Sequence, residues 1–390
     1  MKFSLLRDSS LSALVAGFVT VLVGFTSSAV LVFQAAQSVG ATALQTSSWL
    51  WALGLGIGLS GLLLSLYYKI PIATAWSTPG AAILIAGASG FTIHQAVGAF
   101  IVSGLLIAIA GFSGLFARAS RYIPVSLAAA MLAGILLQFG LNVFTALQTN
   151  VLLVGSMLLG YLLGKRLMPR YAILLALCIG LLICFFQGQL YLQTVQWQLT
   201  RPVWISPEWS LSAIISLGLP LFIVTMTSQN LPGIAAIQTA GYRPPISGMI
   251  GWTGTANTIF APFGAFTINL AAISASICLG KEAHENPQKR YTAAVYAGLF
   301  YILIGLFGAT VTAVFLAFPK ALVVAIAGLA LFGTIASSLL SALKQDGQRE
   351  AALITFLITA SGLSLFGIGA AFWGLVAGAL TLFILPASRH

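Results

Sequence analysis

Charged residues are scarce in this chain. Its 390 residues include only 17 Lys and Arg and six Asp and Glu, while 59% of the residues are hydrophobic. A water-soluble domain needs more charge than this to cover its surface. Soluble classes are therefore excluded, and continuous apolar runs of about 18 to 25 residues predict an all-α polytopic membrane protein rather than a β-barrel.

Acidic residues and histidines are missing from the middle of the apolar runs. They all lie near the ends of these runs or between them, at Asp8, Glu208, Glu282, Glu285, Asp346, Glu350, His94, His284 and His390. A proton relay, a metal cluster or a catalytic triad needs such groups inside the protein. The sequence therefore predicts neither an enzyme nor a cofactor or metal site. The three cysteines lie in apolar segments and suggest no disulfide.

The charge that is present is mostly positive and unevenly placed. A formal net charge of +11 without a basic stripe does not favour nucleic-acid binding. Of the 17 basic residues, only Arg201 and Lys320 fall on one side of the predicted membrane topology, which leaves fifteen on the other. This asymmetry predicts both termini on the cytoplasmic side, with fourteen segments at 11–35, 47–67, 72–89, 94–116, 122–142, 149–165, 169–188, 211–230, 245–261, 263–279, 291–316, 319–342, 349–365 and 367–387.

Two stretches suggest an internal repeat. IPVSLAAAMLAGILL at 123–137 and FPKALVVAIAGLALF at 318–332 lie half a chain apart, and each runs from a Pro into an Ala-rich helix. Each would be the fifth segment of a seven-segment half. Because seven is odd, the two halves would have opposite orientations in the membrane, which defines a 7+7 inverted repeat.

The stretch TAWSTPGAAIL at 74–84 places polar residues and a Pro-Gly pair inside a membrane segment, and Pro262-Phe263-Gly264 is its expected counterpart in the tenth segment. Backbone without helical bonds must line a protein-enclosed cavity. A half-helix that begins there presents free N–H groups to an anion. Ser77 or Thr78 would cap the first half-helix, and Thr267 or the backbone after Gly264 the second. Simple helix kinks are the alternative.

Several further polar and aromatic residues are candidates for the same site, because buried amides and hydroxyls need partners. The alternative for the polar ones is a hydrogen bond between helices, and for the aromatic ones ordinary packing. The predicted substrate-binding residues are Ser28, Gln34, Trp76, Ser77, Thr78, Pro79, Gly80, Gln229, Asn230, Phe263, Gly264, Ala265, Phe266, Thr267 and Asn269.

The chain resembles the benzoate:proton symporter family in TAWSTPGAAIL, in SQNLPGIAAI at 228–237 and in IGAAFWGLVAG at 368–378. That family is similar in fold to nucleobase permeases and sulfate/anion transporters. The resemblance implies a core domain of residues 1–118 and 211–317, a gate domain of 119–210 and 318–390, and a short strand plus half-helix in the third and tenth segments. Nucleobase permeases carry glutamates where this chain has Gln229 and Ala265, which disfavours a nucleobase.

The prediction is a secondary active transporter of the bacterial inner membrane that takes up benzoate or a similar small aromatic carboxylate by motion of core against gate. The resemblance implies proton symport, although no buried carboxylate is available to bind the proton. Two alternatives stay open: the substrate's own carboxylate carries the proton, or transport is uncoupled or an exchange. A nucleobase or inorganic anion transporter and an anion channel are the alternatives. Related folds commonly dimerise through the gate, so a homodimer is an expected partner.

Overall fold

The computed structural model describes residues 5–116, 124–169, 172–190, 196–271, 274–281, 283–363, 365 and 370–385. The predicted domain boundary at residue 118 lies outside these ranges, as does a group of the charged residues counted above: Lys2, Arg118, Arg121, Arg170, Glu282 and Arg389.

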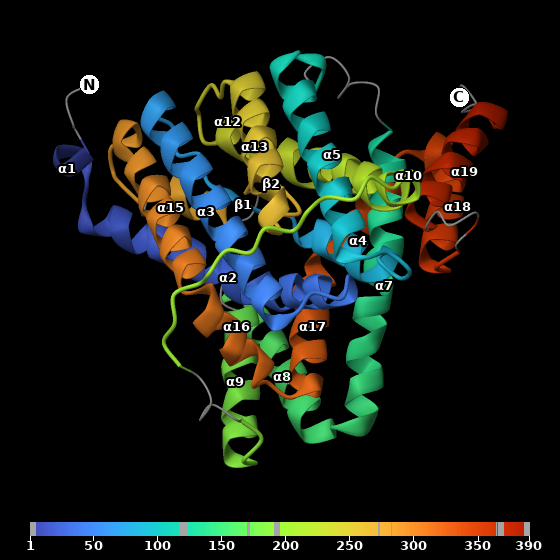
Figure 1. Cartoon of the computed structure of the whole chain (residues 1–390), viewed down its shortest axis with the longest axis horizontal. Helices are drawn as coiled ribbons and strands as arrows, with labels where there is room; N and C mark the ends of the chain where they lie inside the picture. The colour runs from blue at the N-terminus through green and yellow to red at the C-terminus, as the bar shows by residue number, and fades with distance from the viewer. Residues whose placement is uncertain are drawn as a thin grey trace.

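The first half of the chain forms long helices around one short strand (Figure 1). Helix α2 begins at Leu11 because Ser10 accepts a hydrogen bond from Ala13 N, and capping boxes at Thr42 and Thr92 start α3 and α5. The elements are α1 (Leu5–Asp8), α2 (Leu11–Ser38), α3 (Ala43–Tyr68), β1 (Thr74–Trp76), α4 (Thr78–Gly87), α5 (Ile93–Phe112), α7 (Val125–Thr149), α8 (Val151–Leu167) and α9 (Ala172–Phe186).

The second half of the chain also places one short strand among its helices, and these helices are more irregular. Its elements are α10 (Leu211–Ala213), η3 (Ile214–Gly218), α11 (Leu219–Val224), η4 (Thr225–Asn230), α12 (Leu231–Thr239), α13 (Ile246–Phe260), η5 (Ala261–Phe263), β2 (Ile268–Leu270), α14 (Ala275–Leu279), η6 (Pro287–Lys289), α15 (Tyr291–Leu306), α16 (Gly308–Leu316), α17 (Lys320–Ala342), η7 (Asp346–Gln348), α18 (Arg349–Ala360) and α19 (Ala370–Ile384).

Helices from the two halves pack against each other in pairs. Helix α3 lies along α15, α5 along α13, and α7 along α17 and α18. Gly54 meets Gly305 where α3 and α15 approach, and Gly111 meets Gly251 where α5 and α13 approach. Small residues let helix backbones come this close, which is typical of helix pairs in membranes. The pairs therefore interleave the two halves of the sequence into one body.

The two strands pair near the middle of the molecule (Figure 1). β1 and β2 are antiparallel, with Thr74 opposite Leu270 and Trp76 opposite Ile268. All strand residues are buried except Ala75, which is half-buried. Because strand backbone cannot satisfy itself alone in an apolar interior, each broken segment supplies the hydrogen-bond partner of the other.

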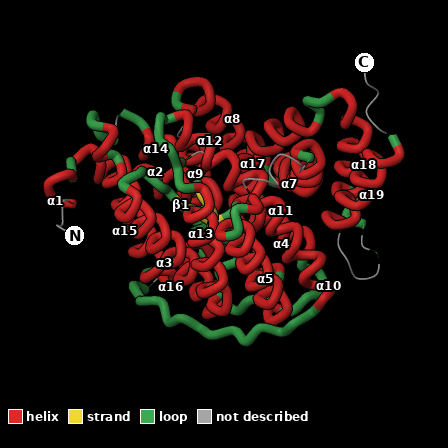
Figure 2. Tube along the Cα trace, turned by 90° about the horizontal axis from the view of Figure 1, so that it is seen from above, coloured by secondary structure: helices red, strands yellow, loops and turns green. Residues whose placement is uncertain are grey.

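An extended segment, residues 196–208, crosses one end of the helices as a strap (Figure 2). Its exposed Trp197 and Trp204 have the amphipathic character of side chains at a membrane interface. Five of its backbone N–H groups donate to residues of five different elements, at 2.7–3.0 Å. The pairs are Gln198 N to Thr310 Oγ1, Thr200 N to Leu306 O, Val203 N to Ser48 Oγ, Ile205 N to Pro262 O and Glu208 N to His94 O.

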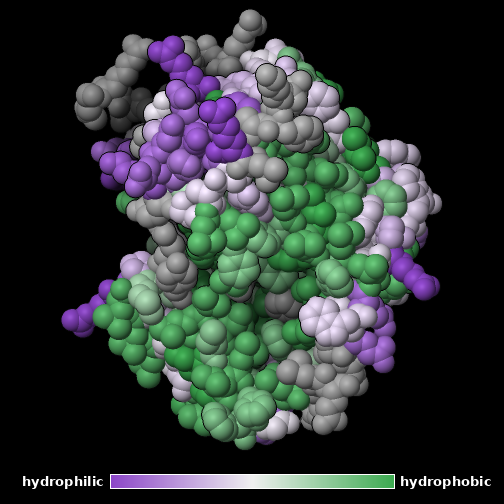
Figure 3. Space-filling view, turned by 90° about the vertical axis from the view of Figure 1, so that its left-hand side faces the viewer, coloured by the Kyte–Doolittle hydropathy of each residue, from purple (hydrophilic) through white to green (hydrophobic). Residues whose placement is uncertain are grey.

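Among the described residues, five helices are long and apolar enough to cross a membrane, or seven if each of two bent pairs counts as one span. The molecule is a mostly helical membrane protein, and a broad apolar surface is visible in Figure 3. The fourteen-segment count stays a prediction. The expected equivalence of Pro79-Gly80 with Pro262-Phe263-Gly264 is wrong, because the first pair follows its strand whereas the second group ends α13 and precedes β2.

Candidate functional site

The start of α4 leaves one backbone donor without a partner. Ser77 is the N-cap, and its Oγ accepts from Gly80 N at 2.9 Å, while Ala81 N donates to Ser77 O at 2.9 Å. Pro79 has no N–H. Among the described residues nothing accepts from Thr78 N, and the Thr78 side chain, which is half-buried, has no hydrogen bond either. Thr78 therefore presents an N–H and a hydroxyl at the positive end of a buried helix, an arrangement suited to an anion.

The strand pair fixes where this helix end lies. Ser77 N is 3.3 Å from Thr267 Oγ1. With its amide oriented so that the oxygen faces Ser77, Asn269 accepts from Ser77 N at 3.0 Å and donates to Leu270 O at 2.9 Å. Both side chains are fully buried. They thus hold the segment just before α4 and leave the Thr78 N–H free.

The second half-helix differs from the expectation. α14 begins at Ala275, and neither Thr267 nor the backbone after Gly264 caps it, because these residues precede β2. Gly264 instead ends η5 with φ at 107°. α14 has only five residues and no side-chain cap at Ser274. Among the described residues, the helix start with a defined anion-binding geometry is therefore that of α4.

The eighth predicted segment contains two π-helical turns, η3 and η4. Each turn is followed by a proline, Pro220 or Pro232, whose missing N–H interrupts the α-helical bonding pattern. At η4 the wider turn is closed by Leu231 N donating to Met226 O. Such turns often occur at functional sites. The sequence reasoning missed them, although two prolines within one apolar run were the available signal.

The adjacent amides of η4 have different surroundings. Asn230 is fully buried, and its Oδ1 accepts from Leu270 N at 2.9 Å, so it supports β2. Gln229 is half-buried and its side chain has no hydrogen-bond partner in the described part of the chain. Thr225 Oγ1, on the same π turn, is buried and also unpaired there. Because η4 contacts α4, β2 and α7, Gln229 and Thr225 are the better candidates for a ligand.

Trp76 and Ser28 are joined directly. Trp76 Nε1 donates to Ser28 Oγ at 2.8 Å, and the ring packs edge-on against Phe25 and Tyr301. Gln34 lies two turns further along α2 and is half-buried. α2 contacts α4 on one side and α9 and α17 on another. The structure therefore brings Ser28, Trp76 and the α4 segment together.

The other predicted aromatic walls lie apart from each other. Phe263 packs against Trp51 and Trp204 under the strap, with ring centroids 5.4 Å apart in each case. Phe266 is fully buried against Trp49 and Phe100. Ala265, also buried, bonds Phe260 O through its backbone N–H. A single aromatic slot that includes Trp76, Phe263 and Phe266 is not formed by these contacts.

The fold is that of a class of membrane transporters. Over 98% of its length the chain superposes on the structure of SLC26A9 with a TM-score of 0.63, covering 67% of that chain at 14% identity. It superposes on the transmembrane domain of a cyanobacterial bicarbonate transporter, BicA, with a TM-score of 0.59, 14% identity and coverage of 97% and 98%. At such identities the likeness concerns the fold, which agrees with the expected relation to anion transporters.

The family follows from sequence comparison. The chain matches the family model described as benzoate membrane transport protein over residues 7–384, and it belongs to that family. It is 43% identical over 382 residues to the benzoate membrane transport protein of Acinetobacter baylyi, with 98% and 97% of the two chains covered. It is 50% identical over 372 residues to the inner membrane protein YdcO of Escherichia coli K12, with 95% of each covered. The predicted resemblance is confirmed, and the family is one of transporters rather than enzymes.

Proposed function

We propose that this protein is a secondary transporter that takes up benzoate or a similar small aromatic carboxylate across a bacterial inner membrane. The observation that carries the proposal is the free donor pair on Thr78, at the start of a buried helix that Ser77, Thr267 and Asn269 hold in place. A carboxylate bound there would be stabilised by the helix end without a cationic side chain. Membership of the benzoate transport family supports this substrate class.

The amide of Gln229 is the second donor in the proposal. A neutral amide can donate to a carboxylate, whereas a glutamate at this position would repel it. Trp76 supplies the aromatic wall, since its indole nitrogen is already bound to Ser28 and its ring is held in place. Asn230 and Asn269 would support the site through β2.

The packing of the helices supports an inverted repeat with a core and a gate. If the halves are related by a two-fold axis in the membrane plane, segments 3 and 10 and segments 5 and 12 pair with each other. The structure has these contacts: β1 of segment 3 pairs with β2 of segment 10, and α7 of segment 5 packs against α17 of segment 12. The gate would comprise α7–α9 and α17–α19, and α4 and η4 contact α7 at its boundary with the core. Motion at this boundary would give alternating access.

Proton symport is part of the proposal, with the substrate's carboxylate as the carrier of the proton. The distribution of basic residues supports both termini on the cytoplasmic side. Uptake of labelled benzoate into proteoliposomes should rise when the outside is made acidic. Uptake that ignores an imposed pH gradient would exclude symport while leaving transport itself in place.

The test of substrate class is thermal stabilisation of the purified protein by benzoate, salicylate, uracil, xanthine, sulfate and bicarbonate. A ligand that binds only the folded state raises the melting temperature. Benzoate or salicylate should do so, and the shift should shrink in Gln229→Ala. A shift with uracil alone, or with sulfate or bicarbonate alone, would replace the aromatic carboxylate by a nucleobase or an inorganic anion.

A further inference from the structure

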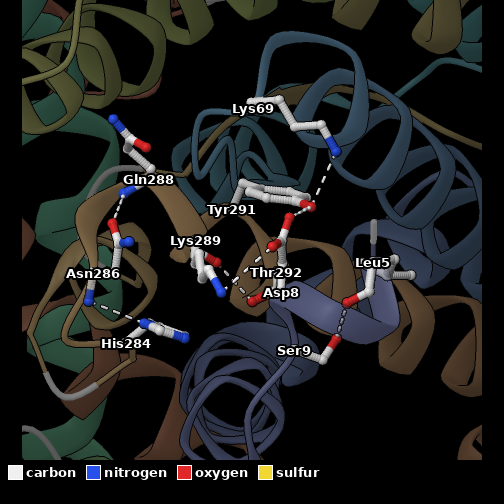
Figure 4. Close-up of polar contacts among 10 residues, drawn as sticks. All are labelled: Leu5, Asp8, Ser9, Lys69, His284, Asn286, Gln288, Lys289, Tyr291 and Thr292. Carbon is white, nitrogen blue, oxygen red and sulfur yellow. Dashed lines mark hydrogen bonds and ion pairs between the residues drawn. The ribbon is translucent and has the colours of Figure 1, made fainter. Parts of the chain in front are cut away.

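A polar pocket of about 440 Å³ lies where α1, the end of α3 and the start of α15 meet. This pocket is separate from the candidate site around Thr78, because none of its lining residues belongs to β1, α4 or η4. Its lining includes Asp8, Lys69, Tyr242, Asn286, Gln288 and Lys289. Figure 4 shows Lys69 and Asp8 directed toward the Tyr291 hydroxyl, and Lys289 directed toward Asp8.

The two lysines belong to one chain of hydrogen bonds and an ion pair. Lys69 Nζ donates to Tyr291 Oη at 3.0 Å and lies 4.1 Å from the centre of the Tyr291 ring. Tyr291 Oη in turn donates to Asp8 Oδ2 at 2.9 Å, and Lys289 Nζ lies 3.6 Å from Asp8 Oδ1. Among the described lining residues, one carboxylate therefore stands beside two ammonium groups, an excess of one positive charge.

The loop that forms the other wall is fixed by buried groups. Arg290 is 7% exposed and donates to His284 O at 2.8 Å and to Leu279 O at 3.0 Å. Tyr242 Oη donates to Pro287 O at 2.7 Å, and burial raises the pKa of this phenol, so it stays neutral. Gln288 N donates to Asn286 Oδ1 at 2.9 Å. Both side chains are exposed, and no acceptor among the described residues binds either side-chain amide nitrogen.

Exposed side chains suited to hydrocarbon lie close in the sequence to the pocket residues. Tyr67, two residues before Lys69, is 76% exposed, and Leu11, three residues after Asp8, is 77% exposed. Leu63, one turn before Tyr67 in the membrane-length helix α3, is 58% exposed. In Figure 3 a hydrophilic area borders the apolar surface at one end of the molecule. An occupant of this pocket would thus meet charge and amide donors at one end and apolar side chains at the other.

We propose that this pocket binds the phosphate of an anionic phospholipid, with the acyl chains lying along Leu11, Leu63 and Tyr67. Lysine ammonium groups and amide donors are suited to phosphate oxygens. Basic pockets at the ends of membrane helices recognise anionic headgroups in this way. Such a lipid would join the N-terminal segment, α3 and α15, and its site is independent of the transported substrate.

The experiment compares lipids added to the detergent-purified protein. Phosphatidylglycerol, phosphatidylcholine with the same acyl chains, and inorganic phosphate are titrated while the melting temperature is followed, and bound lipid is counted by native mass spectrometry. Phosphatidylglycerol should stabilise at lower concentration than phosphatidylcholine. Lys69→Gln should weaken its apparent affinity about fivefold, the contribution of one lysine near an anionic headgroup. Lys344→Gln, an exposed residue away from the pocket, is the matched control.

A second variant protects the test against misfolding. Gln288→Glu places a negative charge at the mouth of the pocket without removing a side-chain hydrogen bond, and it should weaken phosphatidylglycerol binding as well. Gln345→Glu, outside the pocket, should leave it unchanged. Equal stabilisation by both lipids, or wild-type affinity in both pocket variants, would overturn the proposal. Inorganic phosphate that matches phosphatidylglycerol at the same concentration would reassign the pocket to a free anion.

Discussion

Trp76 Nε1 donates a hydrogen bond to Ser28 Oγ over 2.8 Å, which ties the last residue of β1 to α2. Ser28 Oγ itself donates to Gly24 O at 3.0 Å, so the hydroxyl acts as a link between the strand and the helix backbone. Trp76 is 4% exposed. The orientation of the indole is therefore set by this bond as well as by packing.

Ser28→Ala should lower the free energy of unfolding by about 1–3 kcal/mol, because it leaves the buried indole N–H without an acceptor. Trp76→Phe should lose less stability through this bond, because it removes the N–H donor itself and leaves no buried N–H group unpaired. The two changes act on the same hydrogen bond, so their effects should not add. A double-mutant cycle by thermal or denaturant unfolding measures this, and additive losses would show that the bond contributes little.

Gln229→Ala and Asn230→Ala should differ in opposite ways, the first in benzoate affinity and the second in stability. Asn230→Ala leaves the buried Leu270 N–H unpaired and should cost about 1–3 kcal/mol of stability. Gln229→Ala removes no hydrogen bond within the described residues, so the melting temperature without ligand should stay near that of the wild type. Its benzoate affinity should fall about tenfold or more, as expected for a hydrogen bond to a charged group. Ligand titrations of both variants distinguish the two roles, and a reversed pattern would exchange them.

Ser77→Ala should lower stability by about 1 kcal/mol through loss of the α4 cap. It should also weaken benzoate binding, because the first turn of α4, which carries Thr78 N, is no longer held by the bond from Gly80 N to Ser77 Oγ. Thr42→Ala is the matched control, since Thr42 caps α3 away from the strand pair. It should cost a similar stability and leave benzoate affinity unchanged. If both variants bind benzoate like the wild type, the start of α4 is not the anion site.

Gly264→Ala should strongly destabilise the protein. Gly264 has a φ of 107°, which residues with a Cβ rarely adopt, and an added Cβ would overlap the Trp49 ring. Gly333→Ala, in α17, meets no atom within 4 Å and should raise stability by about 0.5–1 kcal/mol. Yield and melting temperature of the two purified variants check this, and a folded Gly264→Ala variant of wild-type stability would contradict the described turn.

Ser48→Ala should loosen the strap. Ser48 Oγ donates to Phe263 O at 3.0 Å and accepts from Val203 N at 2.9 Å, so its removal leaves two partly buried backbone groups unpaired. The expected loss is about 1–3 kcal/mol. Ser47→Ala removes only a bond to Leu44 O within the same helix and should cost less. Hydrogen exchange at Val203 should quicken in the first variant alone, and equal exchange in both would argue against this link.

The mostly helical fold and the start of α4 could be predicted from the sequence because their signals are local. Long apolar runs set the helices, and Ser77 followed by Thr-Pro-Gly is a start signal that needs no knowledge of the rest of the chain. Ser77 was one of two candidates for the α4 cap, and it is the cap. The strand and half-helix of the third segment were implied by the family resemblance, and both are present.

The residues that depend on tertiary contacts were harder to predict. Gln229 and Asn230 are neighbours of the same type, and only the position of β2 decides which of them is used for support. Thr267 was expected to cap a helix but lies on the strand side of the break, opposite Ser77, because a proline can end one element as readily as begin another. Cross-strand register of this kind is not encoded by any local pattern.

The strand pair also constrains how the chain can be made. Ser77 and Thr267 are 190 residues apart, so β1 leaves the ribosome long before its partner exists. Until then the third segment has backbone groups that neither lipid nor its own helix can satisfy. The first half must therefore wait at an interface or against a membrane insertase. Assembly of the interior is a late, long-range step governed by the arrival of the second half.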